Sequence, residues 1–389
     1  MDVATFEWLL TPGGQDLLAL ATALTEAAGT NDLSLGARLR REHSPDQVAA
    51  ALTQVELRRR ATTKFGDDAA LMYWTPDGLE QATRRRVAEH RAARLRVAQV
   101  GTLIDLGCGI GGDLVAAARV GITVAGVDLD PLRVAIAQAN LMALGLGGAV
   151  AQSDATHIDH TPFDVAYADP ARRSARGRSF DPDDWSPPWS LVEELFGRDA
   201  CVKVAPGIPH ERIPEGVEGE WISDHGEVKE AALWSGMLSS TRRRATVIGN
   251  GGLATLTDED ETHDAVGDMA DYLYEPDGAV IRAGLVQAVV AGVRGTLIDP
   301  HIAYVTSPDL FATPFAKAYV VEAELPYRTK ALRAALRERG IGRLTIKKRG
   351  VAVVPETLRR ELAPQGDNEG TIVMTRANGE GHCWLVRPL

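Results

Sequence analysis

Residues 105–113 of the 389-residue chain read DLGCGIGGD, and this glycine-rich stretch is the strongest indication of the fold. It joins an apolar run, TLIDLG (102–107), to an alanine-rich run, GGDLVAAARV (111–120). The pattern predicts a buried strand, a tight turn and a helix. The glycines permit the turn and let a ligand approach the backbone at the helix N-terminus. Because a lone GxGxG pattern is weak evidence, the neighbouring segments decide its meaning.

The segments that follow alternate between strands and helices. Further strands are expected at 123–130, 149–155, 163–170 and 201–206. Pro131 opens the helix after the first of them, at a position that favours proline. Such alternation predicts a parallel sheet with helices on both faces, and ligand sites at the carboxyl ends of its strands.

Two further acidic residues end predicted strands. Asp128 lies about 20 residues after the glycines, where a carboxylate can accept hydrogen bonds from ribose hydroxyls. Asp154 ends the next strand, in QSDA (152–155), where it can accept a hydrogen bond from an adenine amino group. A nucleotide cofactor is therefore expected. A dinucleotide is one interpretation, and the capping of strands and turns is the structural alternative for Asp105 and Asp154.

Together these motifs resemble the class I S-adenosylmethionine-dependent methyltransferases. The resemblance implies S-adenosylmethionine as the cofactor and an α/β fold with a Rossmann-like, seven-stranded methyltransferase sheet. It implies that the methionine part lies over the glycines, that Asp128 holds the ribose and Asp154 the adenine, and that Asp105 supports the methionine end. The cofactor-binding residues that it implies are Asp105, Gly107, Cys108, Gly109, Gly111, Asp128, Leu129, Asp154 and Ala155.

The fourth predicted strand ends in ADPARR (168–173). Many amino-methylating members of this family carry (D/N/S)-P-P-(Y/F/W) here, and the resemblance makes Asp169 and the carbonyl of Pro170 the catalytic pair. They would accept hydrogen bonds from an amino group and direct its lone pair. Such chemistry needs positioning more than a strong base, because the methyl donor already carries positive charge. Ala171 and Arg172 replace the second proline and the aromatic residue, so a stacking face must come from elsewhere.

The candidates for substrate contact are Trp74, Arg172, Arg173, Trp185, Lys347, Lys348 and Arg349. The loop after 170 mixes arginines with tryptophans, as nucleic-acid grooves do, although tryptophans that pack back on the sheet are an alternative. Trp74 belongs to an aromatic connector that resembles the segment before the sheet in trimethylguanosine synthase-like RNA methyltransferases. In that interpretation it closes over cofactor or substrate. In the other, its ring staples the N-terminal helices to the sheet.

The C-terminal part has the predicted order strand, helix, strand, helix, strand, strand from residue 316. Five motifs resemble those of bacterial methyltransferases with a C-terminal THUMP-like domain. They are DPARR (169–173), KVAPGI (203–208), GEVKEA (226–231), LPYRTK (325–330) and GRLTIKKRG (342–350). THUMP domains proper occur in RNA-modifying enzymes and engage tRNA, so the resemblance implies tRNA or rRNA as the substrate. Lys347, Lys348 and Arg349 would then line a phosphate track, with a solvated basic face as the alternative.

Four parts are therefore expected along the chain. They are an N-terminal helical domain with its connector (1–75), a methyltransferase domain (76–250), a connecting segment of open role (251–315) and a small THUMP-like α+β domain (316–389).

The net charge of −11, from 42 basic and 53 acidic residues, taken as a whole argues against a nucleic-acid partner. Its distribution changes that conclusion. Residues 36–96 carry 13 basic and 8 acidic side chains, residues 97–315 carry 15 and 32, and residues 316–389 carry 14 and 8. Two basic segments flank an acidic centre, so the net charge restricts where RNA can lie without excluding it.

Other classes find little support in the composition. The 3 cysteines form no CxxC pair and the 9 histidines show no HxH or HxxxH spacing, so neither a disulfide framework nor a metal site is expected. Apolar runs are too short for a membrane span, and the N-terminus lacks the basic region of a signal peptide. A reducing cytoplasm is therefore the expected compartment.

We expect a cytoplasmic S-adenosylmethionine-dependent methyltransferase that methylates a base nitrogen of tRNA or rRNA. One alternative is a methyltransferase for a protein or a small molecule. Another is an RNA-associated protein that binds the cofactor without turnover. The sequence leaves the oligomeric state open.

Overall fold

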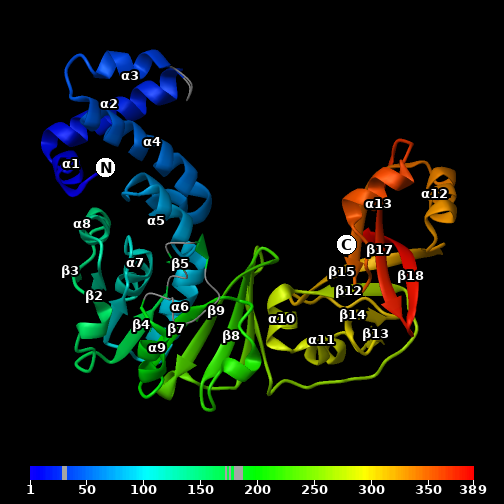
Figure 1. The fold of residues 1–389 in the computed structure, drawn as a ribbon. Coiled ribbons are helices and arrows are strands. Elements are labelled where there is room, and N and C mark those ends of the chain that lie inside the picture. The colour runs from blue at the N-terminus through cyan, green and yellow to red at the C-terminus, as the bar shows by residue number, and fades with distance from the viewer. Residues whose placement is uncertain (29–32, 171–172, 175–176, 179–186) are drawn as a thin grey trace. The chain divides into compact units, whose positions relative to one another are not determined.

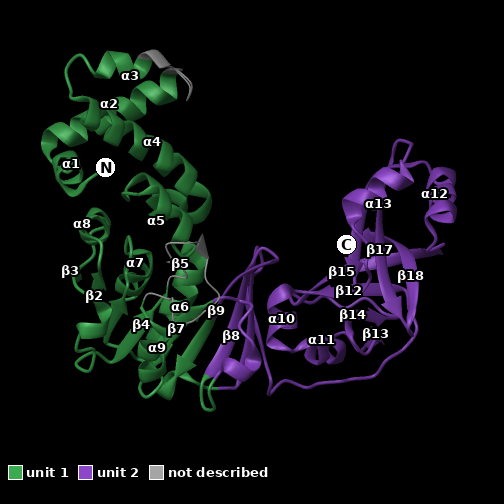
Figure 2. Ribbon diagram, viewed as in Figure 1, with its two compact units in different colours: residues 1–204, 214–217, 232–240 green, residues 205–213, 218–231, 241–389 purple. Residues whose placement is uncertain are grey.

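The computed structural model describes residues 1–389 except for 29–32, 171–172, 175–176 and 179–186. The chain forms two compact units, which Figure 2 colours differently and which are described separately. The first contains Met1–Val204, Pro214–Val217 and Ala232–Ser240, and the second contains Ala205–Ile213, Glu218–Ala231 and Thr241–Leu389.

The first unit begins with helices, as the sequence predicts (Figure 1). They are α1 (Val3–Leu9), α2 (Pro12–Ala28), α3 (Leu33–Leu39), α4 (Pro45–Phe65), the 3-10 turn η1 (Gly66–Ala70), α5 (Pro76–Gln81) and α6 (Arg85–Val97). Ser44 caps the start of α4. The Ser44 hydroxyl accepts from the Gln47 N–H at 3.3 Å, and the Gln47 side chain accepts from the Ser44 N–H at 3.0 Å. This reciprocal pair satisfies two backbone donors that the helix leaves free.

The aromatic connector after α4 packs the N-terminal helices onto the rest of the unit. Trp74 is 0% exposed, and its ring centroid lies 4.6 Å from that of Phe65. The Tyr73 N–H donates to the Asn140 side-chain oxygen at 2.7 Å, while the Asn140 amide donates to the Ile110 carbonyl at 2.9 Å. The structure thus gives Trp74 the packing role that one interpretation assigned to it. Its ring has no exposed face, so the structure does not support the alternative interpretation in which Trp74 contacts the substrate.

The α/β class is confirmed, and the large sheet has nine strands among the described residues where seven were expected. Its hydrogen-bonded order is β11-β10-β8-β9-β7-β4-β1-β2-β3. Sequence patterns indicate β9 (Glu227–Ser235) and β10 (Arg243–Gly249), but they do not indicate β8 (Glu218–Asp224) or β11 (Gly252–Thr257). β8 is buried along its whole length but contains three acidic residues, so it lacks the apolar run typical of a buried strand. β11 pairs antiparallel with β10 (Arg243–Gly249) across the two-residue turn Asn250-Gly251, a common hairpin turn.

In the first unit, five parallel strands carry the expected alternation with helices. The elements are β1 (Thr102–Leu106), α7 (Gly112–Arg119), β2 (Thr123–Asp128), α8 (Pro131–Ala143), β3 (Ala149–Gln152), β4 (Val165–Ala168), α9 (Trp189–Leu195) and β7 (Ala200–Val204). Asp105 in β1 pairs with Gly126 of β2 and with Tyr167 of β4, and Ala168 of β4 pairs with Val202 of β7. Because these pairings are parallel, the carboxyl ends of the four strands meet at one edge.

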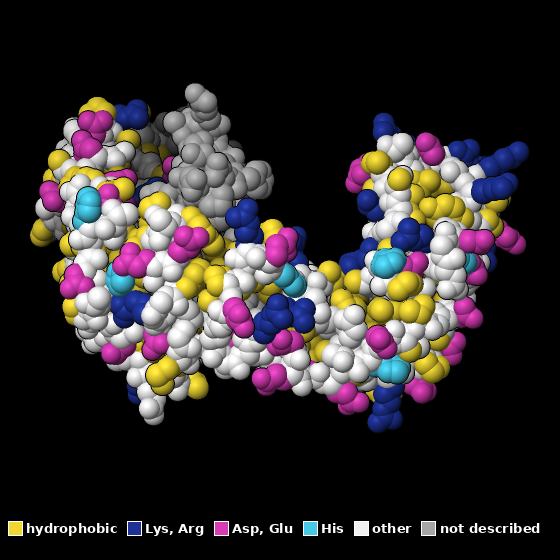
Figure 3. All heavy atoms as spheres, turned by 60° about the horizontal axis from the view of Figure 1, so that its bottom comes forward, with side chains coloured by type: hydrophobic (Ala, Val, Ile, Leu, Met, Phe, Trp, Pro, Cys, Tyr) yellow, Lys and Arg dark blue, Asp and Glu magenta, His cyan; other side chains and the backbone are white. Residues whose placement is uncertain are grey.

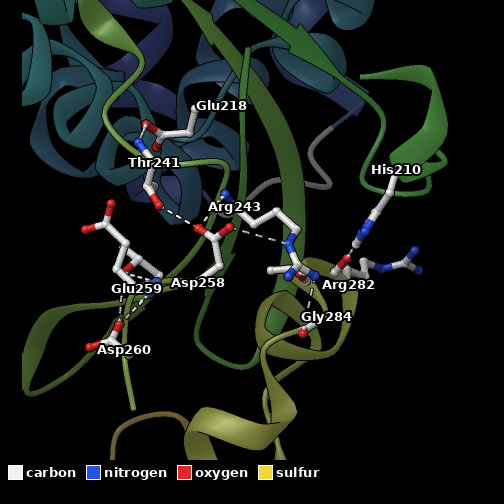
Figure 4. Close-up of polar contacts among 11 residues, drawn as sticks. His210, Glu218, Thr241, Arg243, Asp258, Glu259, Asp260, Arg282 and Gly284 are labelled. Carbon is white, nitrogen blue, oxygen red and sulfur yellow. Dashed lines mark hydrogen bonds and ion pairs between the residues drawn. The ribbon is translucent and has the colours of Figure 1, made fainter. Parts of the chain in front are cut away.

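In the second unit, α10 (Gly278–Ala283) packs on β8 and β10. A polar network joins these elements (Figure 4). The Asp258 carboxylate accepts from the Thr241 hydroxyl at 2.5 Å and from the Arg243 N–H at 3.1 Å. The Arg243 guanidinium donates to the Ala283 carbonyl at 3.2 Å. The network therefore fixes the end of α10 to the start of β10.

The remainder of the second unit is built on a seven-stranded sheet of order β13-β14-β12-β15-β18-β17-β16. Its elements are β12 (Tyr272–Pro276), α11 (Val286–Gly292), β13 (Thr296–Asp299), β14 (Ile302–Ser307), β15 (Ala316–Leu325), α12 (Thr329–Glu338), β16 (Ile341–Arg349), α13 (Pro355–Leu362), β17 (Asn368–Ala377) and β18 (Glu380–Pro388). The predicted element order from residue 316 is confirmed. The segment whose role the sequence left open supplies β12, β13 and β14 to the same sheet.

Asp68, a buried residue in η1, connects three helical elements. Its carboxylate accepts two hydrogen bonds from the Arg119 guanidinium in α7, at 2.5 and 2.6 Å, and lies 3.3 Å from the Arg85 guanidinium in α6. Burial by itself would raise the pKa of Asp68, but the hydrogen bonds and charge of Arg119, together with the charge of Arg85, lower it overall.

Substitution of Asp68 by alanine leaves Arg119 without its carboxylate partner. We expect the free energy of unfolding at neutral pH to fall by about 1–3 kcal/mol, measured by urea denaturation. Because folding lowers the pKa of Asp68, its contribution is complete above about pH 4 and is lost as the pH falls through the folded-state value. The difference between wild type and Asp68→Ala should therefore shrink in acid. Asp67→Ala, at the exposed neighbour, is the control, and an equal loss in both variants would contradict the assignment.

Candidate active site

The glycine loop between β1 and α7 has an open backbone. The Gly107 and Cys108 N–H groups both donate to the Val127 carbonyl at 2.9 Å, which ties the loop to β2. Gly109 has φ of 56° and no heavy atom within 4 Å of the place where a Cβ would lie. Gly111 has φ of 82° and directly precedes α7, and a Cβ there would lie 3.2 Å from the Cα of Ala137. Both positions favour glycine, and the space at Gly109 lets a ligand approach the loop.

Asp128 holds this loop against the end of β2. One carboxylate oxygen accepts from the Gly109 N–H and the other from the Asp130 N–H, each at 2.9 Å. The next residue, Leu129, has a 58% exposed side chain. An acidic residue at this strand end is where nucleotide-binding sheets hold a ribose. Ribose contact by Asp128 and Leu129 stays a prediction.

Asp154 lies at the end of β3 and begins the short turn η2 (Ala155–His157). Its Oδ1 accepts from the Thr156 N–H at 2.9 Å and from the Thr156 hydroxyl at 2.7 Å. These hydrogen bonds lower the pKa of Asp154. The structure therefore shows the turn-capping role for Asp154, and adenine contact by Asp154 and Ala155 stays a prediction.

Asp105 is buried at the end of β1 and has an unsatisfied atom. Its Oδ1 has no hydrogen-bond partner among the residues that the structure describes. Burial, followed by the charges of Asp113 and Asp169, raises the pKa of Asp105 well above its usual range. Buried polar atoms without partners are rare in native proteins, so a donor from a ligand is the expected partner.

Arg91 of α6 supplies a positive charge to this acidic edge. Its guanidinium is buried, forms an ion pair with Asp113 in the first turn of α7, and lies 4.6 Å from the centroid of the Tyr167 ring in β4. Sequence patterns did not single out Arg91, because a helix with five arginines and one glutamate in thirteen residues resembles a solvated one.

Asp169 follows β4 and is held by a lysine from the neighbouring strand. The Lys203 ammonium donates to Asp169 Oδ2 at 2.5 Å and to the Thr83 hydroxyl at 3.2 Å. The Asp169 side chain is 35% exposed and that of Lys203 is 16% exposed. Pro170 is buried next to it. Asp169 thus lies at the same strand-end edge as the glycine loop, as predicted, with a partner that the sequence analysis did not assign.

The side chains of the other loop candidates for substrate contact are not described by the structure. Arg172 and Trp185 lie outside the described residues. Arg173 belongs to the short ladder of β5 (Arg173–Ser174) and β6 (Gly177–Arg178), where only the backbone is described. The Cys108 side chain is buried, so it can reach a ligand only through its backbone.

Two of the three predicted basic residues of β16 have partners within their own sheet. The Lys347 ammonium lies 2.6 Å from Glu275 Oε2, which also accepts from the Tyr319 hydroxyl at 2.9 Å. The Arg349 guanidinium lies 5.2 Å from the centroid of the Tyr304 ring. Of the three predicted phosphate-binding residues, Lys348 alone is exposed. The side-chain contacts therefore do not favour a continuous phosphate track made of Lys347, Lys348 and Arg349.

Comparison with known proteins assigns the family. Residues 103–172 match the family described as a methyltransferase domain, residues 316–388 match one described as THUMP domain-like, and residues 2–61 match a domain family of unknown function. Over 332 residues the chain is 37% identical to uncharacterized S-adenosylmethionine-dependent methyltransferases of Mycobacterium tuberculosis strains H37Rv and CDC 1551, covering 82% of this chain and 90% of theirs. The chain belongs to the S-adenosylmethionine-dependent methyltransferases.

A solved structure has the same fold along almost the whole chain. The protein, described as a methyltransferase of Porphyromonas gingivalis W83, matches 96% of this chain and 98% of its own, with a TM-score of 0.76 at 22% identity. The family, the enzyme class and the cofactor S-adenosylmethionine inferred from the sequence are therefore confirmed. Among the described residues, no helix is long and apolar enough to cross a membrane.

The methyltransferase site gives a direct test at Asp128. Asp128→Ala removes the carboxylate that orders the loop, and we expect the affinity for S-adenosylhomocysteine to fall about 10- to 100-fold, as for loss of a hydrogen bond to a charged group. Isothermal titration calorimetry measures it. Asp130→Ala is the matched control, because Asp130 caps α8 at the same strand end. Unchanged affinity in Asp128→Ala would contradict the assignment.

Proposed function

We propose that this methyltransferase methylates a base nitrogen of RNA, and that Asp169 with the carbonyl of Pro170 orients the amine. The observation that carries the proposal is the position of Asp169. It follows β4 at the edge where the glycine loop lies, and its charge acts on the buried Asp105. A carboxylate there can accept an N–H of the substrate and turn the nitrogen lone pair away from itself.

The cofactor residues of this proposal are those of the strand ends. Asp105 would bind the cofactor's amino group, which supplies the donor that Oδ1 lacks. Gly107, Gly109 and Gly111 would pass beneath the methionine part. Asp128 with Leu129 would hold the ribose and the start of the base. When bound, S-adenosylmethionine supplies an electrophilic methyl group on a positively charged sulfur.

What Asp169 does follows from its chemistry. The substrate nitrogen gains a methyl group and a positive charge, and it must then lose a proton. A carboxylate that already accepts one of its N–H bonds lies on the path by which that proton can leave. Positioning contributes more to such a reaction than basicity, so the hydrogen bond is the part that a substitution removes.

Support for RNA comes from the C-terminal module. Residues 316–388 match the THUMP-like family, and exposed basic residues occur in and beside α12. Figure 3 shows Lys and Arg side chains on the surface of this module. Exposed cations on a small domain are suited to the phosphate backbone. The 3 cysteines are buried and no disulfide joins them, which fits a reducing compartment, and we propose the cytoplasm.

The substrate class is tested by methyl transfer from tritium-labelled S-adenosylmethionine. We expect wild-type protein to label RNA extracted from cells that lack its gene, and Asp169→Ala to lower the rate about 100-fold with unchanged cofactor affinity. Asp159→Ala, at an exposed aspartate that bonds only Thr161 among the described residues, is the control. Label in protein or small molecules would instead indicate a methyltransferase for those substrates. Cofactor binding without any label would indicate a protein that binds the cofactor without turnover.

The RNA-binding face is tested on α12, where Lys330 and Arg337 are exposed and seven residues apart, on one side of the helix. If each contacts a phosphate, Lys330→Ala and Arg337→Ala should each weaken RNA binding and lower the slope of log affinity against log salt by about 1. Fluorescence anisotropy at several salt concentrations measures this. Point variants are preferable to deletion of the module, because β15 pairs with β12. An unchanged salt slope would contradict the assignment.

A further inference from the structure

We propose that Lys203 is a positioning residue for Asp169: its ammonium group fixes the direction of the carboxylate so that the other oxygen faces the amine to be methylated. The proposal rests on the function proposed above. Lys203 lies in β7, and Ala168↔Val202 are register partners, so Asp169 and Lys203 are the next residues of adjacent parallel strands. Their contact follows from the register of the sheet, and a chance surface encounter is not needed to explain it.

Asp169 and Thr83 both bind the Lys203 ammonium and help to hold it in place. It lies 2.5 Å from Asp169 Oδ2 and 3.2 Å from the hydroxyl of Thr83, which is buried between α5 and α6. The ammonium therefore bridges the end of β4 to the helical connection that precedes the sheet. An ammonium with two fixed acceptors and little exposure has few alternative positions, so the carboxylate that it binds is ordered too.

The charges at this edge explain why a cation is needed. Asp105, Asp113 and Asp169 lie close enough together for the latter two to raise the pKa of Asp105. Arg91 pairs with Asp113, and Lys203 pairs with Asp169. Without Lys203, repulsion from the other carboxylates would favour rotation of Asp169 toward solvent, because its side chain is partly exposed.

The pairing also gives the two oxygens of the Asp169 carboxylate different roles. Oδ2 binds Lys203, whereas Oδ1 has no hydrogen-bond partner among the residues that the structure describes. Oδ1 is thus the oxygen left to accept the substrate N–H. A displacement of about 1 Å in a reacting geometry can cost about 100-fold in rate. We therefore expect the order of Oδ1 to affect the rate of methyl transfer.

The experiment compares Lys203→Met with wild type in the transfer of tritium from labelled S-adenosylmethionine to RNA from cells that lack the gene. We expect kcat to fall about 100-fold, while the KM for RNA and the affinity for S-adenosylhomocysteine change by no more than about twofold. Lys203→Arg, which keeps the charge, should recover most of the rate. Lys229→Met is the matched control, because Lys229 is also a strand lysine paired with a carboxylate, that of Glu227. A wild-type kcat in Lys203→Met would overturn the proposal.

A double-mutant cycle separates positioning from folding, and its stability measurements do not depend on the substrate. In the Asp169→Asn background, Lys203→Met should cost no further activity, and the losses of unfolding free energy of the two single variants should not add. Strictly additive losses would show that Lys203 does not hold Asp169 and would overturn the proposal. If wild type labels no RNA, the proposed function fails, and the stability cycle still decides whether the pair exists.

Discussion

The ion pairs Arg91–Asp113 and Lys203–Asp169 lie where the carboxyl ends of parallel strands bring acidic side chains together. The register of β1, β4 and β7 brings Asp105 and Asp169 to one edge, and Asp113 lies in the first turn of α7 after β1. The two cations offset the repulsion that results. Asp105 remains the exception, a buried carboxyl with an oxygen that the described residues do not satisfy. A positively charged cofactor fits such an edge because it adds the missing donor and the missing charge.

The glycine stretch and the acidic strand ends predicted the family and the cofactor because both signals are local. A glycine with positive φ or an aspartate directly after an apolar run can be read without knowledge of distant contacts. Lys203 could not be assigned in the same way. Its role depends on the pairing of β4 with β7, 34 residues apart in the sequence, and a lysine in a buried strand gives no local sign of its partner. The family resemblance includes the motif KVAPGI, which begins with Lys203, but it assigns no role to that lysine.

Burial decided two further questions that composition left open. Aromatic residues in a connector are equally typical of a ligand lid and of a core, and complete burial of Trp74 favours the core. The basic run of β16 was expected to face RNA, yet alternate residues of a strand point to opposite faces. Lys347 and Arg349 therefore contact Glu275 and Tyr304, while Lys348 is exposed. The fold of residues 251–315 could not be predicted from their own sequence. Its short strands β12, β13 and β14 belong to a sheet whose other strands begin with β15, later in the chain.

The most direct test of the strand-end site is a crystal structure of the protein with S-adenosylhomocysteine. We expect the amino group of the ligand within hydrogen-bond distance of Asp105 Oδ1, its ribose at Asp128, and its sulfur on the side of the loop where Asp169 remains paired with Lys203. A ligand bound away from the glycine loop, or an Asp105 Oδ1 that stays without a partner while Asp169 turns from Lys203, would contradict the proposed site.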